Sequence, residues 1–143
     1  MPHLTLIATI GAGTAPTGVA VNNDSNLIYV ANGDSLDIID GKTLQIAAHI
    51  PTMTGLGSYS VALNPKTNLI YVANFNSASV TVIDSANNIV KMIEVGKSPI
   101  EIAVNPVTNK IYVVNSDDNS VRVIDGGNIP GSVGINTVTF ATN

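Results

Sequence analysis

Apolar and polar positions follow one another in the same order three times along the chain. The middle copy, Asn64 to Asp84, reads NPKTNLIYVANFNSASVTVID, and similar stretches run from Asn22 to Asp40 and from Asn105 to Asp125. The tyrosines of these copies recur about every 42 residues, a period typical of proteins built from one repeated supersecondary unit. Length varies between the copies only in the polar connections, so the apolar runs define the unit.

Each repeat predicts four short strands. The second and third strands, LIYVAN and VTVID in the middle repeat, are apolar at odd and even positions, which indicates burial on both faces. The segment Asn64-Pro65-Lys66-Thr67-Asn68 joins the first two strands, and its Pro and Asn residues are typical of a tight turn. The fourth strand alternates more clearly, and Lys91 and Glu94 indicate that it is the solvated outer edge.

Antiparallel four-stranded sheets that are apolar on both faces are typical of the blades of a β-propeller, in which each blade packs against two neighbours. We therefore predict an all-β protein that forms a single propeller module. Its three blades are expected at residues 18–50, 60–95 and 101–142. Residues 4–10 (LTLIATI) are similar to a fourth strand and predict an extra outer strand ahead of the first blade.

The repeat also carries a family motif. The pattern P-x-x-[AV]-[VL]-N-P-x-T-N-x-I-Y-V-[AV]-N…V-x-V-I-D, most complete from Pro99 to Asp125, resembles the YVTN-type β-propeller repeat, and the resemblance covers about residues 4–142. It implies a closed ring, and it points to surface-layer and secreted proteins and, more distantly, to enzymes with a site on the propeller axis. An extracellular or cell-surface location is therefore favoured, although no signal peptide is visible in MPHLTLIATIGAG.

Three blades are too few for a closed propeller, which needs roughly four to eight. An open wedge would expose an apolar face at each end, which isolated proteins rarely tolerate. We therefore expect either further blades of a longer chain or association of the chain with itself, with a dimer of six blades favoured. The strand expected at residues 4–10 would be available for exchange between copies.

The composition excludes some classes of partner. Only 11% of the residues are charged, the net charge is -4 and the six basic residues are scattered, whereas nucleic-acid binding needs clustered Lys and Arg. No apolar run approaches the roughly 20 residues of a membrane-spanning helix. The chain has no cysteine, which excludes disulfides and zinc-thiolate sites. We expect neither a nucleic acid nor a membrane span.

The candidate catalytic residues are few. His3 and His49 stand alone, and we interpret His49 as an edge residue whose counterpart in the next repeat is Glu94. An aspartate ends the third strand of every repeat, and a residue that recurs in this way indicates turn capping rather than a site. No nucleophile, paired carboxylate or phosphate-binding loop occurs. We therefore predict a protein that is not an enzyme and has no cofactor or metal.

Function is expected where the repeats differ. In an up-and-down blade, the connection into the first strand and the turn after the second strand share one end of the sheet, which we call the rim. A protein-binding or structural scaffold is the function that this pattern favours. The alternatives are a propeller enzyme with an axial site lined by Gly18, Ser60 and Glu101, and a surface-layer component. The rim candidates for binding are Asp34, Tyr59, Phe75, Glu101, Asp117 and Asp118.

Overall fold

A computed structural model of the chain describes residues 3–53 and 55–127, and the regular secondary structure within them is almost entirely β-strand. One short 3₁₀-helix, η1 (Ser116–Asp118), interrupts them. The prediction of an all-β protein is confirmed. The strands are β1 (Pro16–Asn22), β2 (Leu27–Asn32), β3 (Ser35–Asp40), β4 (Gln45–Pro51), β5 (Ser58–Asn64), β6 (Leu69–Asn74), β7 (Ser79–Ile83), β8 (Ile89–Glu94), β9 (Pro99–Asn105), β10 (Lys110–Asn115) and β11 (Ser120–Asp125).

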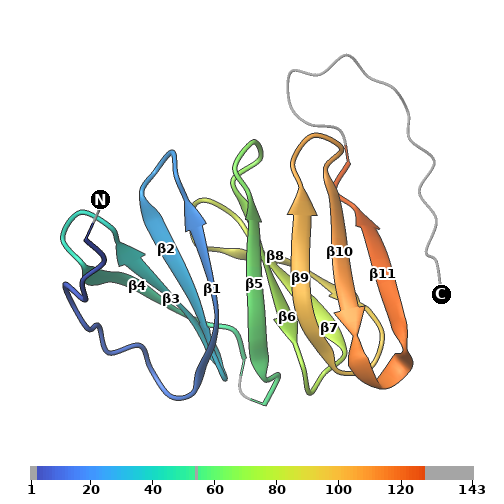
Figure 1. Ribbon diagram of the computed structural model, residues 1–143. Helices are drawn as coiled ribbons and strands as arrows, with labels where there is room; N and C mark the ends of the chain where they lie inside the picture. Colours follow the sequence, from blue (N-terminus) through green and yellow to red (C-terminus); the bar gives the residue numbers. More distant parts are fainter. Residues whose placement is uncertain (1–2, 54, 128–143) are drawn as a thin grey trace.

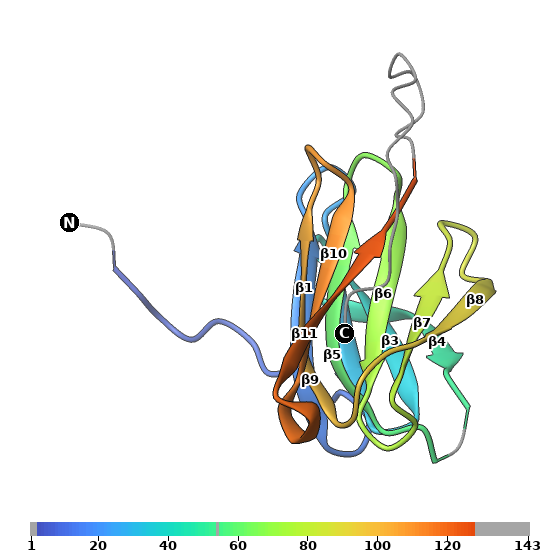
Figure 2. The same ribbon diagram turned by 90° about the vertical axis from the view of Figure 1, so that its right-hand side faces the viewer.

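The strands form three antiparallel sheets in chain order, which we call blade 1 (β1–β4), blade 2 (β5–β8) and blade 3 (β9–β11). The blades stand side by side, with β1, β5 and β9 along one side of the stack and β4 and β8 on the opposite side (Figures 1 and 2). The fourth strand that we expect for blade 3, within residues 101–142, lies outside the described residues.

Turn chemistry explains why each sheet folds back on itself where it does. The asparagine that ends the first turn of each blade has a positive φ, 55° at Asn26, 58° at Asn68 and 53° at Asn109, as expected of a residue that tolerates the left-handed region. The aspartate after each third strand accepts backbone hydrogen bonds two residues on. The Asp40 carboxylate accepts one from the Lys42 N–H at 2.7 Å, and the Asp125 carboxylate accepts one from the Gly127 N–H at 2.9 Å.

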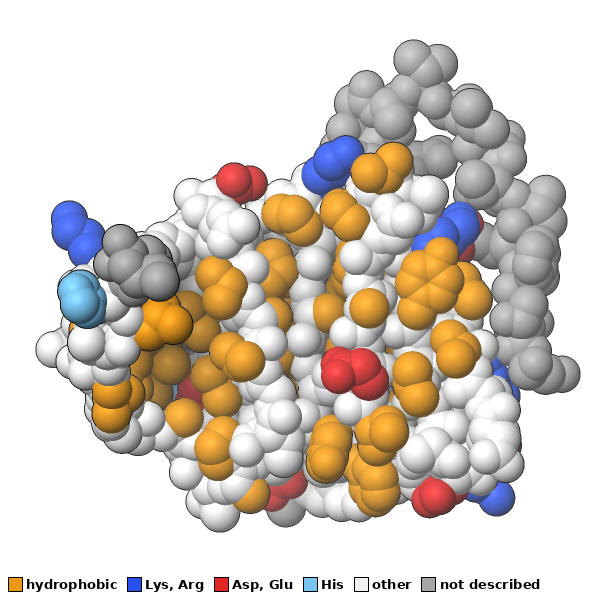
Figure 3. Space-filling view, viewed as in Figure 1, with side chains coloured by type: hydrophobic (Ala, Val, Ile, Leu, Met, Phe, Trp, Pro, Cys, Tyr) orange, Lys and Arg blue, Asp and Glu red, His pale blue; other side chains and the backbone are white. Residues whose placement is uncertain are grey.

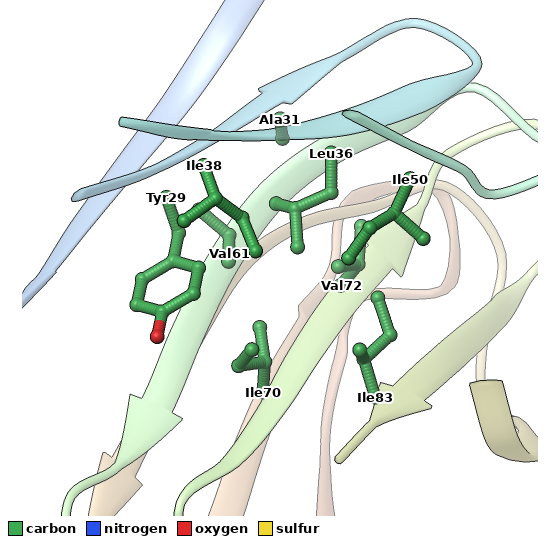
Figure 4. Packing of buried hydrophobic residues seen from close by; sticks show 9 residues of the cluster. All are labelled: Tyr29, Ala31, Leu36, Ile38, Ile50, Val61, Ile70, Val72 and Ile83. Carbon is green, nitrogen blue, oxygen red and sulfur yellow. The ribbon is translucent and has the colours of Figure 1, made fainter. Parts of the chain in front are cut away.

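The hydrophobic core lies between the blades. One cluster fills the space between blades 1 and 2, and Figure 4 shows Tyr29, Leu36 and Val61 meeting there from opposite sheets. A second cluster, which includes Tyr71, Val80 and Ile102, fills the space between blades 2 and 3. Blade 2 therefore buries both of its faces, which is why its central strands carry apolar residues on both of them.

The strand predicted at residues 4–10 is not formed. This segment pairs with no strand of the described chain, and Leu4 is 97% exposed. It runs away from blade 1 on the side of β1, as Figure 2 shows. The physical reason is that a strand needs the hydrogen-bonding edge of a sheet, and no described sheet precedes blade 1.

Candidate binding rim

The six loops predicted to share one end of the sheets do so. The ends of β2, β6 and β10 and the starts of β1, β5 and β9 lie together at the lower end of the molecule in Figure 1. Backbone hydrogen bonds connect these loops, from Phe75 N–H to Gly57 O at 2.8 Å in blade 2 and from Ser116 N–H to Ser98 O at 3.0 Å in blade 3. The Ser58 N–H donates to Gly33 O and links blade 2 to blade 1. The rim loops are therefore tied together within blades 2 and 3 and between blades 1 and 2.

Two of the predicted rim residues form an aromatic pair. The ring centroids of Tyr59 and Phe75 are 5.7 Å apart and the rings are tilted by 34°. Both side chains stay more than a third exposed, at 40% and 37%. Exposed aromatic side chains of this kind are common in surfaces that bind other proteins.

Glu101 joins two blades. Its Oε1 accepts a hydrogen bond from Ser60 Oγ at 2.8 Å and another from the Ile102 N–H at 3.1 Å. The corresponding position of blade 1 is Gly18, where a Cβ would lie 2.9 Å from Ser60 Cα, so the two backbones touch there. Of these three inner-strand positions only Glu101 carries an ionisable group.

The three rim aspartates are each held by a neighbouring segment, Asp34 and Asp117 by the adjacent rim loop, and they are not brought together. Asp34 Oδ1 accepts the Gly55 N–H at 3.0 Å, and Asp117 Oδ2 accepts Ser98 Oγ at 2.5 Å. Asp118 Oδ2 lies 3.9 Å from a guanidinium nitrogen of Arg122. Across residues 3–53 and 55–127, no group of three or more His, Asp or Glu side chains is arranged to hold a metal ion. These contacts make the aspartates supports of the rim loops.

Sequence reasoning missed a buried polar cluster on blade 1. Asp37 is 2% exposed, its Oδ1 lies 2.6 Å from His49 Nδ1, and its Oδ2 accepts a hydrogen bond from Asn32 Nδ2 at 2.6 Å. Strand pairing places Asp37 opposite His49. The available signal was the single charged residue inside the apolar run LDIID, because a buried carboxylate requires partners.

The prediction that Glu94 is the counterpart of His49 in the next repeat is wrong. In blade 2 the pair equivalent to Asp37 and His49 is Thr81 and Met92, so the counterpart is Met92 and not Glu94. The cause is the longer turn ahead of the fourth strand in blade 1, where Ile46 faces Ile39 as Ile89 faces Ile83, so that Ile46 and Ile89 are equivalent. A depression of about 510 Å³ lies beside this cluster, and Asn32, Asp34, His49 and Met53 are among the residues that line it.

The arrangement of sheets matches that of larger proteins of known structure. The chain superposes on Kuenenia stuttgartiensis hydrazine synthase with a TM-score of 0.73 and 23% identity over 87% of its length. It superposes on the β-propeller domain of Cps50 (Swd1) from Myceliophteria thermophila with a TM-score of 0.70 and 15% identity over 82% of its length. The chain spans 36% and 38% of those two chains, a little over a third of each.

Comparison of the sequence with known proteins assigns the chain to no family. No protein-family model matches the chain, and no curated protein matches it. The structural likeness and the stacked antiparallel sheets define the class, which is the β-propeller, with three blades in this chain. At these identities the likeness concerns the fold alone. No helix among the described residues is long and apolar enough to cross a membrane.

Proposed function

We propose that the protein is a non-catalytic scaffold of the YVTN-type β-propeller class, which completes its ring with a second copy and offers its rim to a protein or ligand. The repeat motif, most complete from Pro99 to Asp125, supports the choice of repeat type. Propellers form stable rings because each blade is covered on both faces, and among the described residues only blade 2 is.

The observation that carries the proposal is the exposure of apolar side chains on the outward faces of the two end blades. Val19 of blade 1 is 66% exposed and Val121 of blade 3 is 50% exposed, although the equivalent residues of blade 2, Val61 and Val80, are buried. Hydrophobic side chains also gather over β9 and β10 (Figure 3). Apolar patches of this kind mark association surfaces.

Association would also give residues 4–10 a place. This apolar segment leaves the molecule beside blade 1, on the side of β1 (Figures 1 and 2). Strand β11 lies at the edge of its sheet within the described part of the chain. In a ring of two copies, residues 4–10 can pair as an outer strand with the blade 3 of the second copy.

The rim supports a binding role more than a catalytic one. Tyr59 and Phe75 offer an exposed apolar surface, whereas the carboxylates of Asp34 and Asp117 are engaged by the adjacent rim loops, through Gly55 and Ser98. Of the residues equivalent to Gly18, only Glu101 is acidic, and an axial enzyme site would be expected to draw acidic or histidine residues from several blades.

The solution mass tests the proposal. Light scattering on the purified protein is expected to give twice the 14.8 kDa of one chain, and electron microscopy of the particles should show a ring with a central channel. A mass of 14.8 kDa at every concentration would contradict ring closure by a second copy.

A further inference from the structure

We infer that blade 3 of one copy docks on blade 1 of a second copy in the register that joins the blades within a chain, so that both contacts of the ring are of the blade 3 to blade 1 type. The inference rests on the proposed function and specifies its partner surface. It is argued from the two interfaces that the chain already contains, because the repeats place equivalent residues at every blade face.

The two internal interfaces share one apolar arrangement. Between blades 1 and 2, Tyr29 and Leu36 of the earlier blade pack with Val61 of the later blade. Between blades 2 and 3, the equivalent residues Tyr71, Val80 and Ile102 pack in the same cluster. A tyrosine and an aliphatic residue therefore always meet the first strand of the following blade.

Each of the two end faces carries one half of this apolar arrangement. Tyr112 and Val121 of blade 3 are equivalent to Tyr71 and Val80, and Val19 of blade 1 is equivalent to Val61. Tyr112 is 38% exposed, whereas Tyr71 is 2% exposed. The outward faces of blade 3 and blade 1 are therefore complementary to each other and not to themselves, which specifies a head-to-tail contact.

A hydrogen bond between two asparagines recurs at both internal interfaces and supports the same register. Asn22 Nδ2 donates to Asn68 Oδ1 at 3.4 Å between blades 1 and 2, and Asn64 Nδ2 donates to Asn109 Oδ1 at 2.8 Å between blades 2 and 3. The next donor in this series is Asn105, whose Oδ1 accepts the Val107 and Thr108 N–H groups and whose Nδ2 meets no acceptor within the described part of the chain.

The acceptor for Asn105 is then Asn26 of the second copy. Asn26 is exposed and has the same left-handed backbone as Asn68 and Asn109. In a head-to-tail ring each copy supplies one Asn105 and one Asn26, so both contacts contain the asparagine pair. Six blades then carry six such pairs, and none is left open.

The blade 1 face tolerates this burial although it contains a carboxylate. Asp37 already accepts a hydrogen bond from Asn32 and pairs with His49, so covering it leaves no oxygen without a partner. The equivalent positions, Thr81 and Arg122, are polar as well, and they belong to faces that are packed against a neighbouring blade. A polar side chain at this place is therefore compatible with blade stacking.

Two arginine variants test the inference. Val19→Arg blocks the blade 1 face and Val121→Arg blocks the blade 3 face, and each variant alone is expected to be monomeric, with dimerisation weakened by roughly 100-fold or more. An equimolar mixture is expected to form a dimer of one chain of each kind, because one unaltered blade 3 face can still meet one unaltered blade 1 face. Val90→Arg, on β8 of the middle blade, is the matched control and should stay dimeric.

A cross-linking experiment tests whether Asn105 and Asn26 of two copies lie close together, and it does not depend on weakening the dimer. The chain has no cysteine, so a short bismaleimide can join only introduced thiols. Asn26→Cys and Asn105→Cys chains should cross-link when mixed and not when separate. A single chain with both Asn22→Cys and Asn68→Cys is the positive control within one molecule, because this pair makes the same contact between blades 1 and 2 and Asn68 is exposed.

The outcomes separate this inference from the proposed function. A wild-type protein that is monomeric overturns both. The head-to-tail contact is overturned if the wild-type protein is a dimer and Val19→Arg or Val121→Arg leaves it dimeric. It is also overturned if Asn26→Cys chains or Asn105→Cys chains cross-link without the other kind. In both cases ring closure by a second copy remains supported. Circular dichroism and thermal unfolding of each variant confirm that the chains compared are folded.

Discussion

The side-chain amide of Asn64 donates a 2.8 Å hydrogen bond to Asn109 across the space between blades 2 and 3. The two residues are 0% and 1% exposed, so neither amide has water as an alternative partner. Asn64 Oδ1 at the same time accepts the Lys66 N–H at 2.9 Å. One asparagine therefore closes the turn of its own blade and ties that blade to the next.

Replacement of this asparagine should be costly. Asn64→Ala leaves Asn109 Oδ1 buried and unpaired, and we expect a loss of about 1–3 kcal/mol in the free energy of unfolding. Urea denaturation measures the change. Asn23→Ala, in the exposed turn of blade 1, is the control and should stay within about 0.5 kcal/mol of the wild type. Equal effects of the two substitutions would show that the inter-blade bond is not stabilising.

Gly126 makes room for an asparagine. A Cβ at this position would lie 2.4 Å from Asn109 Oδ1, so Gly126→Ala must displace the side chain that Asn64 binds. We expect a destabilisation of about 1–3 kcal/mol from this steric conflict. Gly11→Ala is the matched control, because nothing lies within 4 Å of its Cβ position. Thermal unfolding followed by circular dichroism compares the two, and a tolerated Gly126→Ala would contradict the packing described.

Buried tyrosines should make stability depend on alkaline pH. Burial raises the pKa of Tyr71 above its ordinary value of 10.0, and burial raises that of Tyr29 with a smaller opposing effect from a hydrogen bond to Ser25. A raised pKa means that the folded state keeps its proton longer than the unfolded state. The contribution to stability is therefore complete below pH 10 and is lost as the pH rises through the folded-state values.

Denaturation at a series of pH values tests this prediction. The series runs from about 2 units below to about 1.5 units above the ordinary tyrosine pKa, that is, from about pH 8 to about pH 11.5. The free energy of unfolding should fall above about pH 10, and Tyr71→Phe should make that fall less steep. Ultraviolet absorbance of phenolate in the native protein should show tyrosines that ionise late. A stability that rises with pH over this interval would have the wrong sign for buried tyrosines.

The aromatic pair of the rim can be measured by a double-mutant cycle. Tyr59→Ala, Phe75→Ala and the double variant should reveal a coupling of about 0.5–1.5 kcal/mol, because the ring centroids lie 5.7 Å apart. Each single substitution is expected to cost little in stability, since both side chains are partly exposed. A coupling near zero would mean that the rings do not hold each other in place, and the rim would then offer no ordered aromatic surface.

Much of the architecture was predictable from local patterns. The four-strand repeat follows from apolar runs such as LIYVAN, and the turns follow from residues such as Asn68 and Asp40 whose chemistry acts within a few positions of the chain. The common end of the rim loops follows from strand direction alone. These properties depend on neighbours in sequence, and so a single sequence contains them.

Contacts between sheets required the tertiary structure. The partnership of Asp37 with His49 depends on a register shift, and the bond from Ser60 to Glu101 depends on how closely blades 2 and 3 approach. Residues 4–10 have the pattern of a strand and still form none, because pairing depends on an available edge and not on the segment itself. The sequence by itself determined the repeated sheets and their turns through short-range chemistry. The tertiary structure decided which faces and polar groups meet, because long-range packing sets those distances.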